Sequence, residues 1–456
     1  MPPAASPPPF IGRERELDVL AELADSGRAE LFVLLGRRRV GKTELLQRLC
    51  RDRRAVYFLA AQVRDRDNLR AFQRALQEGL RDALLENVEF PDWAAALTVA
   101  AERAGDERLI VVLDEFPYLC EANRGLPSLV QRFWDQHGKD SSMMLVLCGS
   151  QVSFMEREVL AERSPLFGRR TAQRRLEPLA PSATLAFFPN WNRTDRLTAY
   201  AILGGMPAYL RRFDTNRSLD ENLMREVLRP EGYLFDEVQY LLRTELQNPA
   251  TYNSILGAIA QEAERVGDIA LTVGVDSPTA NKYLHVLREL RIVERTVPLT
   301  DADPLRSRRG VYRISDRFLS FHFRHVQPNL SMIEAGRGAQ VLETFIRPDF
   351  GRLVDAARTD FILEHLRTKA ADLVDEEIVE VGRFCGSAIK ALARTVSGAC
   401  VAALHGETGL KTLEQELGQV QGSFKSEIRM LRYRDREPSA GSLFEVSPYR
   451  LTEARR

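Results

Sequence analysis

The chain has 456 residues, of which 44% are hydrophobic and 28% charged, the profile of a folded protein and not of a disordered one. Its 64 basic and 64 acidic side chains give a net charge of zero, which excludes a globally basic nucleic-acid binder but leaves room for a local basic patch. At about 150 residues per domain, the length predicts about three domains.

The N-terminal stretch MPPAASPPPF is rich in proline and lacks a basic segment followed by an apolar core. It therefore predicts a disordered tail over residues 1–9 and not a signal peptide. Apolar runs such as LIVVL at 109–113 have the length of strands and fall short of the roughly 18 residues of a membrane span. The five cysteines are widely spaced, without a Cys-x-x-Cys pair, as in a reduced protein. We expect a cytoplasmic protein without membrane segments.

Short apolar runs alternate with helical patterns between residues 31 and 180. The runs are continuous, which predicts strands buried on both faces, at 31–36, 55–60, 108–115 and 143–150. Apolar residues recur at helical spacing between them, at 42–50, 68–85 and 126–138. This order predicts an α/β domain over residues 10–180, with a mostly parallel sheet sandwiched by helices.

The first strand is followed by GRRRVGKT, which fits the phosphate-loop pattern G-x-x-x-x-G-K-[ST] and opens a helix. The backbone N–H groups of such a loop point into one concavity that suits a polyphosphate, so the predicted ATP-binding residues are Gly36, Arg37, Arg38, Arg39, Val40, Gly41, Lys42, Thr43 and Glu44. Lys42 is expected to neutralise the β- and γ-phosphates, and the Thr43 hydroxyl to complete the shell of a Mg²⁺ ion. The three arginine side chains occupy variable positions, where they are either solvated, paired with acids or in contact with the ligand.

Polar residues stand at the ends of the two strands predicted at 108–115 and 143–150. Asp114 and Glu115 end the run LIVVLDE about 70 residues after the loop, and Ser150 ends MMLVLCGS. We predict that Asp114 holds the Mg²⁺ ion and that Glu115 activates the attacking water. Ser150 is either a sensor of the γ-phosphate or an ordinary residue of a turn after a strand.

Three further regions are predicted after residue 180. Residues 181–237 form a helical lid, which Gly-Gly and Pro interrupt at 203–210. Residues 238–330 have helices followed by two short strands, the order of a winged helix. Residues 336–456 begin like an α/β domain and end in a polar tail.

The predicted recognition helix of the winged helix runs from Ser277, as N-cap, to Leu290. Thr279, Asn281 and Lys282 would face outward on its first turns. The following segment adds basic side chains for DNA phosphates, at Arg306, Arg308, Arg309, Arg313 and Arg317. Docking of a protein is the alternative use of this region. His322 and His325 are three residues apart, but no third metal ligand is near them in the sequence.

Several stretches resemble one known family. They are FIGRERELDVL, the phosphate loop, LDEFPYL, LCGSQVSFM, SPLFGRRTAQRRLEPL, LGGMPAYL and YRISDRFLSFHFRHVQPN. Together they resemble the archaeal-type ATPases of the AAA+ superfamily, which implies a P-loop ATPase with a winged helix and a C-terminal restriction-endonuclease-like domain. The resemblance also implies that Gly12 and Arg13 line the adenine side of the site. It further implies that Arg169, or else Arg170, is an arginine finger on the γ-phosphate, the alternative being loop arginines that are solvated or contact DNA backbone.

The C-terminal region departs from the family pattern of an active nuclease. Val379 stands where an aspartate belongs, and Ala399 and Val401 stand where the Glu and Lys of Glu-x-Lys belong. These side chains cannot hold a metal ion, so we predict a degenerate nuclease-like domain, unless Glu377 or Glu380 replaces the missing ligands.

The functional hypothesis is an ATP-hydrolysing switch of the AAA+ class that needs ATP and Mg²⁺. Its nucleotide state would control contacts with duplex DNA, a protein partner or further copies of the chain. The alternatives are a non-hydrolysing, nucleotide-stabilised binding module and an ATP-gated nuclease.

Overall fold

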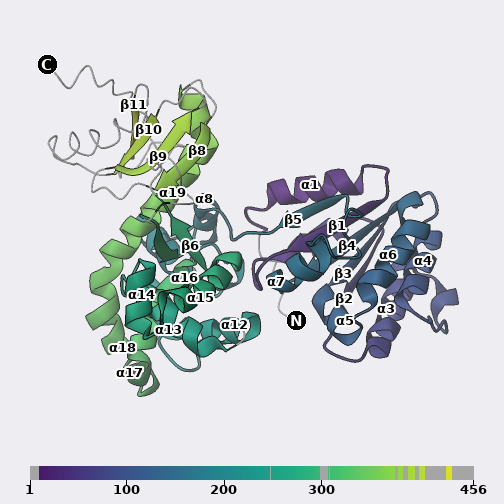
Figure 1. Cartoon of the computed structure of the whole chain (residues 1–456), viewed down its shortest axis with the longest axis horizontal. Coiled ribbons are helices and arrows are strands. Elements are labelled where there is room, and N and C mark those ends of the chain that lie inside the picture. Colours follow the sequence, from purple (N-terminus) through teal and green to yellow (C-terminus); the bar gives the residue numbers. More distant parts are fainter. Residues whose placement is uncertain are drawn as a thin grey trace. The chain divides into compact units, whose positions relative to one another are not determined.

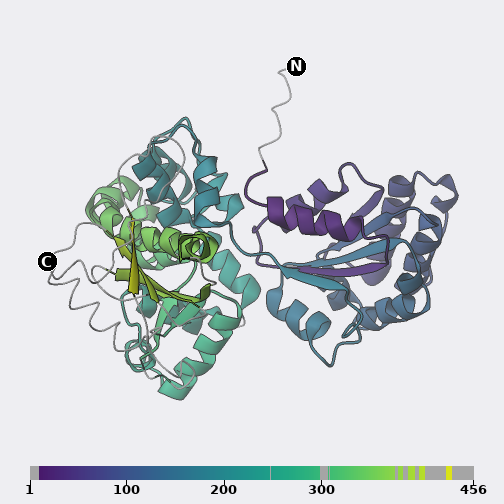
Figure 2. The ribbon, with the colours of Figure 1, turned by 90° about the horizontal axis from the view of Figure 1, so that it is seen from above.

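The structure is a computed structural model that describes residues 10–246, 248–297, 307, 309–374, 378–383, 389–395, 400–405 and 428–433. The chain forms two compact units, which are coloured by sequence position in Figures 1 and 2. Unit 1 comprises Met1–Leu179 and Met206–Arg211, and unit 2 comprises Ala180–Gly205 and Arg212–Arg456. Each unit is described by itself.

Unit 1 is built on a five-stranded parallel sheet with the strand order β2-β3-β4-β1-β5. Its strands are β1 (Glu30–Leu35), β2 (Ala55–Leu59), β3 (Leu109–Asp114), β4 (Met143–Gly149) and β5 (Ala172–Arg175). Every residue of β1, β3 and β4 is buried, because helices cover both faces of the sheet (Figure 2). The predicted parallel α/β fold is confirmed.

Most helices of unit 1 follow its strands as crossovers of the parallel sheet, whereas the first precedes β1 and the last comes well after β5. They are α1 (Glu14–Ala24), α2 (Lys42–Cys50), α3 (Asp65–Leu80), α4 (Trp93–Ala104), α5 (Phe116–Ala122), α6 (Leu126–Gln136), α7 (Val152–Phe154) and α10 (Pro207–Leu210). Phe58, Phe72 and Trp93 pack ring against ring at 5.3–6.0 Å in the core beneath β2 and α3. Aromatic packing of this kind adds to the burial of apolar area.

Unit 2 begins as a helical assembly. Its helices are α8 (Pro181–Thr184), α9 (Arg193–Leu203), α11 (Leu219–Glu226), α12 (Glu237–Glu245), α13 (Pro249–Ala260), α14 (Val266–Val273), α15 (Ser277–Glu289), α16 (Arg317–Phe321), α17 (Leu330–Glu334), α18 (Gly338–Val341) and α19 (Phe350–Val374). The long helix α19 packs against α9 and against β8 (Ile378–Arg383) (Figure 1). It thus connects the helical part of unit 2 with the sheet that follows.

Two small sheets complete the described part of unit 2. β6 (Val293–Thr296) and β7 (Val311–Ile314) pair antiparallel after α13, α14 and α15, the order from which we predicted a winged helix. The second sheet has the order β11-β10-β9-β8, with β9 (Ile389–Thr395), β10 (Cys400–His405) and β11 (Ile428–Tyr433). Both the winged helix and the nuclease-like domain remain interpretations of these elements.

The start of α15 differs from the expectation. Its N-cap is Asp276, whose Oδ1 accepts a hydrogen bond from the Thr279 N–H at 2.6 Å, and Ser277 is the first helical residue. A carboxylate at this position satisfies a free N–H and interacts favourably with the helix dipole, so it displaces the serine as cap. On the inner side, Leu284 and Leu287 are buried as expected.

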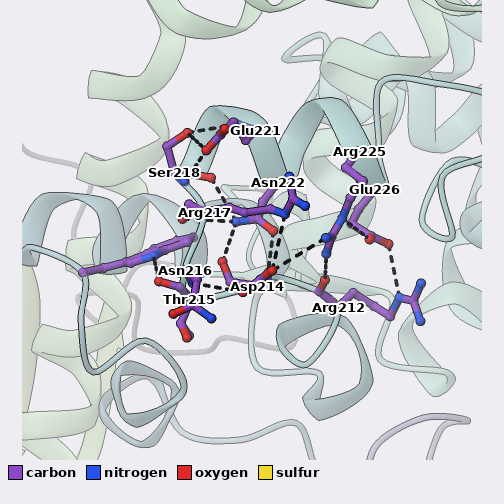
Figure 3. Close-up of polar contacts among 11 residues, drawn as sticks. Arg212, Asp214, Thr215, Asn216, Arg217, Ser218, Glu221, Asn222, Arg225 and Glu226 are labelled. Atoms are coloured by element: carbon purple, nitrogen blue, oxygen red, sulfur yellow. Dashed lines mark hydrogen bonds and ion pairs between the residues drawn. The ribbon is translucent and has the colours of Figure 1, made fainter.

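The turn before α11 is held by a buried asparagine (Figure 3). The Asn222 side chain is fully buried, donates to the carbonyl oxygens of Asp214 and Ser218 at 2.9 Å each, and accepts from the Asp214 N–H at 2.7 Å. Ser218 and Glu221 add a capping box at the first turn of α11. This network satisfies polar groups that burial would otherwise penalise.

A carboxylate between two arginines joins four elements of unit 2. Asp360 of α19 accepts hydrogen bonds from Arg317 of α16 at 2.5 and 2.8 Å, from Tyr200 of α9 at 3.1 Å, and from Arg383 of β8. Burial alone would raise the pKa of Asp360, but the two guanidinium groups hold this pKa below its usual range. Arg317 is therefore an internal partner and not the exposed phosphate ligand that the sequence suggested.

The two histidines after α16 are buried. Among the residues that the structure describes, no three metal-ligating side chains cluster. The His325 Nε2 lies 3.0 Å from a carboxylate oxygen of Asp349. The His322 ring is 1% exposed, and both its nitrogens lack a hydrogen-bond partner. Burial lowers the pKa of His322 to about 4, which keeps the ring neutral.

We expect His322 to make unit 2 less stable in acid. The unfolded chain takes up a proton near pH 6.5, whereas the folded chain does so only near pH 4, so stability is constant above about pH 7 and falls between these two values. The loss at pH 4 is about 3 kcal/mol by linkage. Urea unfolding between pH 7.5 and 4.5 would show it, and His322→Leu should flatten the profile over this range. The same profile in His322→Leu would contradict the assignment.

Two further observations concern the sequence expectations on membranes and cysteines. Within the described ranges, no helix combines the length and the hydropathy that crossing a bilayer requires. Cys50, Cys120 and Cys148 are free thiols, the last two buried, and burial raises the pKa of Cys50 to about 11. These three cysteines pack as reduced side chains, as expected.

Candidate functional site

Three segments meet at one edge of the unit 1 sheet. β1, β3 and β4 are parallel neighbours, so their carboxyl ends lie side by side. The loop 36–41 follows β1, Asp114 and Glu115 stand at the end of β3, and Ser150 follows β4. Residues that are more than 100 positions apart in the sequence thus come together, as the parallel fold predicts.

The loop 36–41 has a backbone that requires glycine at two positions. A side chain at Gly36 would place its Cβ 2.6 Å from the carbonyl oxygen of Leu176, and Gly41 has a φ of 98° at the N-cap of α2. Arg39 adopts a φ of 69°, in the left-handed region that is unfavourable for a residue with a side chain. The conformation of the loop therefore depends on its glycine residues, and the loop leads directly into the N-terminus of α2, which is a favourable position for an anion.

Lys42 lies folded over this loop. Its side chain is 5% exposed, and its Nζ donates to the carbonyl oxygens of Gly36 and Arg37 at 2.7 and 3.0 Å. A lysine held at the centre of a loop of N–H groups places a positive charge where a phosphate group would lie. The role of Lys42 on the β- and γ-phosphates stays a prediction.

Asp114 is held by three donors. Its Oδ2 accepts hydrogen bonds from the Thr43 hydroxyl at 2.8 Å and from the Tyr57 hydroxyl, and its Oδ1 accepts from the Glu115 N–H at 3.0 Å. Asp114 is 1% exposed. The adjacent hydroxyl and carboxylate oxygens of Thr43 and Asp114 are the donor types that Mg²⁺ prefers, so these two residues fit the expected metal. Sequence reasoning missed Tyr57, whose only signal is a hydroxyl in an otherwise apolar strand.

Glu115 is positioned by Ser150. Its Oε2 accepts hydrogen bonds from the Ser150 hydroxyl at 2.7 Å and from the Ser150 N–H at 3.3 Å. Ser150 is buried, and Glu115 has a φ of 56°, in the left-handed region. The activation of a water molecule by Glu115 stays a prediction. In this structure, Ser150 contacts the proposed base directly.

Arg13 forms a hydrogen bond with the backbone of the phosphate loop. Its side chain is buried and its Nη2 donates to the carbonyl oxygens of Val40 and Glu177 at 3.0 and 2.5 Å. The N–H of Gly12 donates to Glu14 at 3.3 Å. Arg13 thus connects the loop with the chain after β5, a role that the sequence did not indicate. The predicted contact of Gly12 and Arg13 with adenine stays a prediction.

The three loop arginines differ in their environments. Arg37 is 7% exposed, so the expectation of a solvated side chain is wrong for this residue. Arg38 donates a hydrogen bond to the Tyr118 hydroxyl of α5 and lies 5.8 Å from the centre of that ring. Arg39 is partly exposed. Arg38 therefore attaches the loop to the helix that follows Glu115.

The predicted arginine finger is paired within unit 1. The Arg169 guanidinium forms two parallel hydrogen bonds with Asp135 of α6, at 2.8 Å each, and its Nη1 donates to the Pro165 carbonyl oxygen at 3.0 Å. The Arg170 Nη1 donates to the Leu160 carbonyl oxygen at 3.1 Å. The structure does not bring either arginine to Lys42, and action on a γ-phosphate would require Arg169 to leave Asp135.

A distant segment also reaches the phosphate loop. Residues Met206–Arg211 belong to unit 1, where a Cβ at Gly41 would lie 3.8 Å from the Pro207 ring. The Arg211 Nη2 forms an ion pair with Glu44 of α2 at 2.5 Å. From the sequence, we expected this segment to be only an interruption, at 203–210, of a helical lid. A separation of 167 residues between Glu44 and Arg211 gives no local signal of the contact.

Comparisons with known proteins agree with this geometry. The family described as an ATPase domain predominantly from Archaea matches residues 10–213. The uncharacterized protein MJECL04 of Methanocaldococcus jannaschii is 34% identical over 329 residues, which are 72% of this chain and 71% of that protein. The solved structure of the Walker-type ATPase PABY2304 of Pyrococcus abyssi has a TM-score of 0.51 at 20% identity, over 69% of this chain and 96% of that one, and so shows a shared fold. The phosphate loop, the acidic end of β3 and these relatives together establish that the chain belongs to the archaeal-type ATPase family of P-loop proteins.

Proposed function

We propose that this protein hydrolyses ATP with Mg²⁺ at the carboxyl edge of the unit 1 sheet and uses the nucleotide state as a molecular switch. The observation that carries the proposal is the joint placement of two pairs at this edge. Thr43 lies 2.8 Å from Asp114 on the metal side, and Ser150 lies 2.7 Å from Glu115 on the side of the attacking water. A protein that only binds nucleotide has no need of the second pair.

The residues divide the work of hydrolysis among them. The loop N–H groups and Lys42 bind the phosphates, with Lys42 exchanging its two carbonyl partners for phosphate oxygens. Thr43 and Asp114 would hold Mg²⁺, which neutralises charge on the phosphate oxygens when bound. Glu115 orients a water molecule and accepts its proton, and Ser150 holds the carboxylate in place. Arg169 would supply charge in the transition state after exchanging Asp135 for the nucleotide.

The rival hypothesis is a non-hydrolysing module that nucleotide merely stabilises. Steady-state release of phosphate from ATP, with and without Mg²⁺ and duplex DNA, separates the two. Turnover that needs Mg²⁺ supports the switch. Tight ATP binding without any release of phosphate would support the rival.

We further propose that α15 presents a surface to duplex DNA. Its exposed residues include Asn281, Lys282, His285 and Arg288, while Leu284 and Leu287 anchor its inner face. Of the other predicted phosphate ligands, Arg309 is exposed, Arg313 is paired with Glu264 at 3.1 Å, and Arg306 and Arg308 lie outside the described residues. The basic contribution that supports the proposal therefore comes mainly from Lys282 and Arg288 on the helix itself.

We expect DNA affinity to fall steeply with salt, and the double substitution of Lys282 and Arg288 by alanine to flatten that dependence. Each lost phosphate contact removes about 0.9 from the slope of log K against log salt, so the expected change is about two. Fluorescence anisotropy of a labelled duplex measures it. A double substitution of Arg66 and Arg70, exposed in unit 1, serves as control. An unchanged slope would indicate that α15 docks a protein instead.

The ATP-gated nuclease has less support. Val379 lies in β8 and Val401 in β10, as expected for the two strands of a nuclease-like sheet, but neither residue offers a metal ligand. Glu380 also lies in β8, whereas Glu377 and Ala399 lie outside the described residues. Incubation of plasmid DNA with the protein and Mg²⁺ or Mn²⁺ tests this reading, and we propose that no cleavage occurs.

A further inference from the structure

The contact between Tyr57 and Asp114 has no role in the scheme above. Tyr57 lies in β2, at the edge of the sheet, and its hydroxyl donates to Asp114 Oδ2. In the β2–β3 register Tyr57 is opposite Val112, two residues before Asp114. Val112 and Asp114 point to the same face of β3, so the long tyrosine side chain reaches the carboxylate diagonally.

We propose that Tyr57 is a positioning residue that fixes the Asp114 carboxylate for Mg²⁺. This inference rests on the proposed function, and it adds a residue on β2 to a site whose other members follow β1, β3 and β4. A hydrogen-bond donor to a metal-binding carboxylate restricts its rotation, and loss of such a partner typically weakens metal binding about 10- to 100-fold.

Tyr57 differs from Thr43, the other hydroxyl on Asp114 Oδ2, in where it is attached. Thr43 belongs to the first turn of α2, directly after the phosphate loop, so its bond to Asp114 depends on the conformation of that loop. Tyr57 is attached to the strand that is hydrogen-bonded to β3 itself, and its bond does not require the loop to be ordered. The Asp114 carboxylate is thus aligned before nucleotide arrives, which lowers the entropic cost of binding the ion.

The chemistry of the phenol suits this role. The Tyr57 hydroxyl donates to the Asp114 carboxylate, and an ordinary phenol keeps its proton up to about pH 10. Tyr57 and Thr43 occupy the two lone pairs of Oδ2, and the Glu115 N–H occupies one of Oδ1, so the second lone pair of Oδ1 is left for Mg²⁺ or a water bound to it.

The test is the Mg²⁺ dependence of nucleotide binding in Tyr57→Phe, which keeps the ring and removes only the hydroxyl. Binding of a fluorescent ATP analogue is titrated with Mg²⁺ and, separately, measured in EDTA. We expect the Mg²⁺ concentration for half-maximal enhancement to rise about tenfold. Affinity in EDTA should stay within about twofold of the wild type, because the phosphate loop is untouched. Tyr252→Phe, which removes a phenol from α13, is the matched control.

A double-mutant cycle makes the assignment specific. In the Asp114→Asn background, Tyr57→Phe should cause no further change in Mg²⁺ dependence, since the two residues act through one bond. An additive effect, an unchanged Mg²⁺ requirement in Tyr57→Phe, or equal weakening with and without Mg²⁺ would each overturn the inference. If the wild type itself shows no Mg²⁺-dependent binding, the proposed function fails first, so the two failures are distinguishable.

Discussion

Lys42→Ala is expected to weaken ATP binding at least about a hundredfold, whereas Glu115→Gln should bind ATP normally and hydrolyse it about 10² to 10⁴ times more slowly. Lys42 lies over the loop carbonyls of Gly36 and Arg37, so its charge acts on the phosphates in the ground state. Glu115 is held by the Ser150 hydroxyl at 2.7 Å, and in the proposed mechanism it contributes only when a water molecule is deprotonated. Equilibrium binding of labelled ATP and steady-state release of phosphate measure the two effects separately.

Two exposed residues of unit 1 provide controls of the same chemistry. Lys139→Ala removes a lysine that follows α6, and Glu121→Gln removes an acid on α5, one turn and a half after Glu115. Neither should change binding or turnover more than about twofold. If Glu115→Gln hydrolyses ATP within about threefold of the wild type, which is less than about 1 kcal/mol in the barrier, Glu115 is not the base.

Asp360→Asn is expected to destabilise unit 2 by about 3 kcal/mol. The substitution keeps the shape of the side chain but leaves Arg317 and Arg383, which are 17% and 18% exposed, without their shared counter-charge. Breaking a largely buried ion pair on one side costs more than the pair itself contributes, because the remaining charge stays desolvated. Calorimetry should show the transition of unit 2 lowered by about 5 °C, as follows from the entropy of unfolding of a unit of this size.

The control for the Asp360→Asn substitution is a substitution in a solvent-exposed ion pair. Glu343 pairs with Arg347 at 2.8 Å in the same unit, and its side chain is 60% exposed. Glu343→Gln should therefore cost less than about 1 kcal/mol. Equal effects of Asp360→Asn and Glu343→Gln would show that the contacts of Asp360 with α9, α16 and β8 contribute no more than a surface pair.

Much of unit 1 could be predicted from short stretches of sequence. The strands β1, β2, β3 and β4 were expected within one residue of their ends, because continuous apolar runs of this length have few alternatives. The expected burial on both faces is correct for β1, β3 and β4 and wrong for β2, which lies at the edge of the sheet and is only partly buried. β5 was missed. Its residues, AQRR, are largely polar, and it is a strand only because the edge of β1 offers backbone partners.

The residues of the candidate site could likewise be predicted from the sequence in part. Lys42, Thr43, Asp114 and Glu115 are recognisable because each stands directly after a buried strand or in a fixed loop pattern, so local sequence determines both their type and their place. The position of Ser150 could also be predicted, but its bond to Glu115 could not.

Tertiary structure alone decided which side chains support these residues. Tyr57 reaches Asp114 through a strand register, Arg13 reaches the carbonyl of Val40 across 27 positions, and Arg211 reaches Glu44 across 167. Arg169 was predicted as an arginine finger from the family resemblance, yet its partner Asp135 depends on how α6 packs. The physical reason is that a phosphate loop and a buried strand are specified by the dihedral and burial demands of consecutive residues, whereas a hydrogen bond between distant side chains exists only once the packing of the whole sheet and its helices has placed both partners.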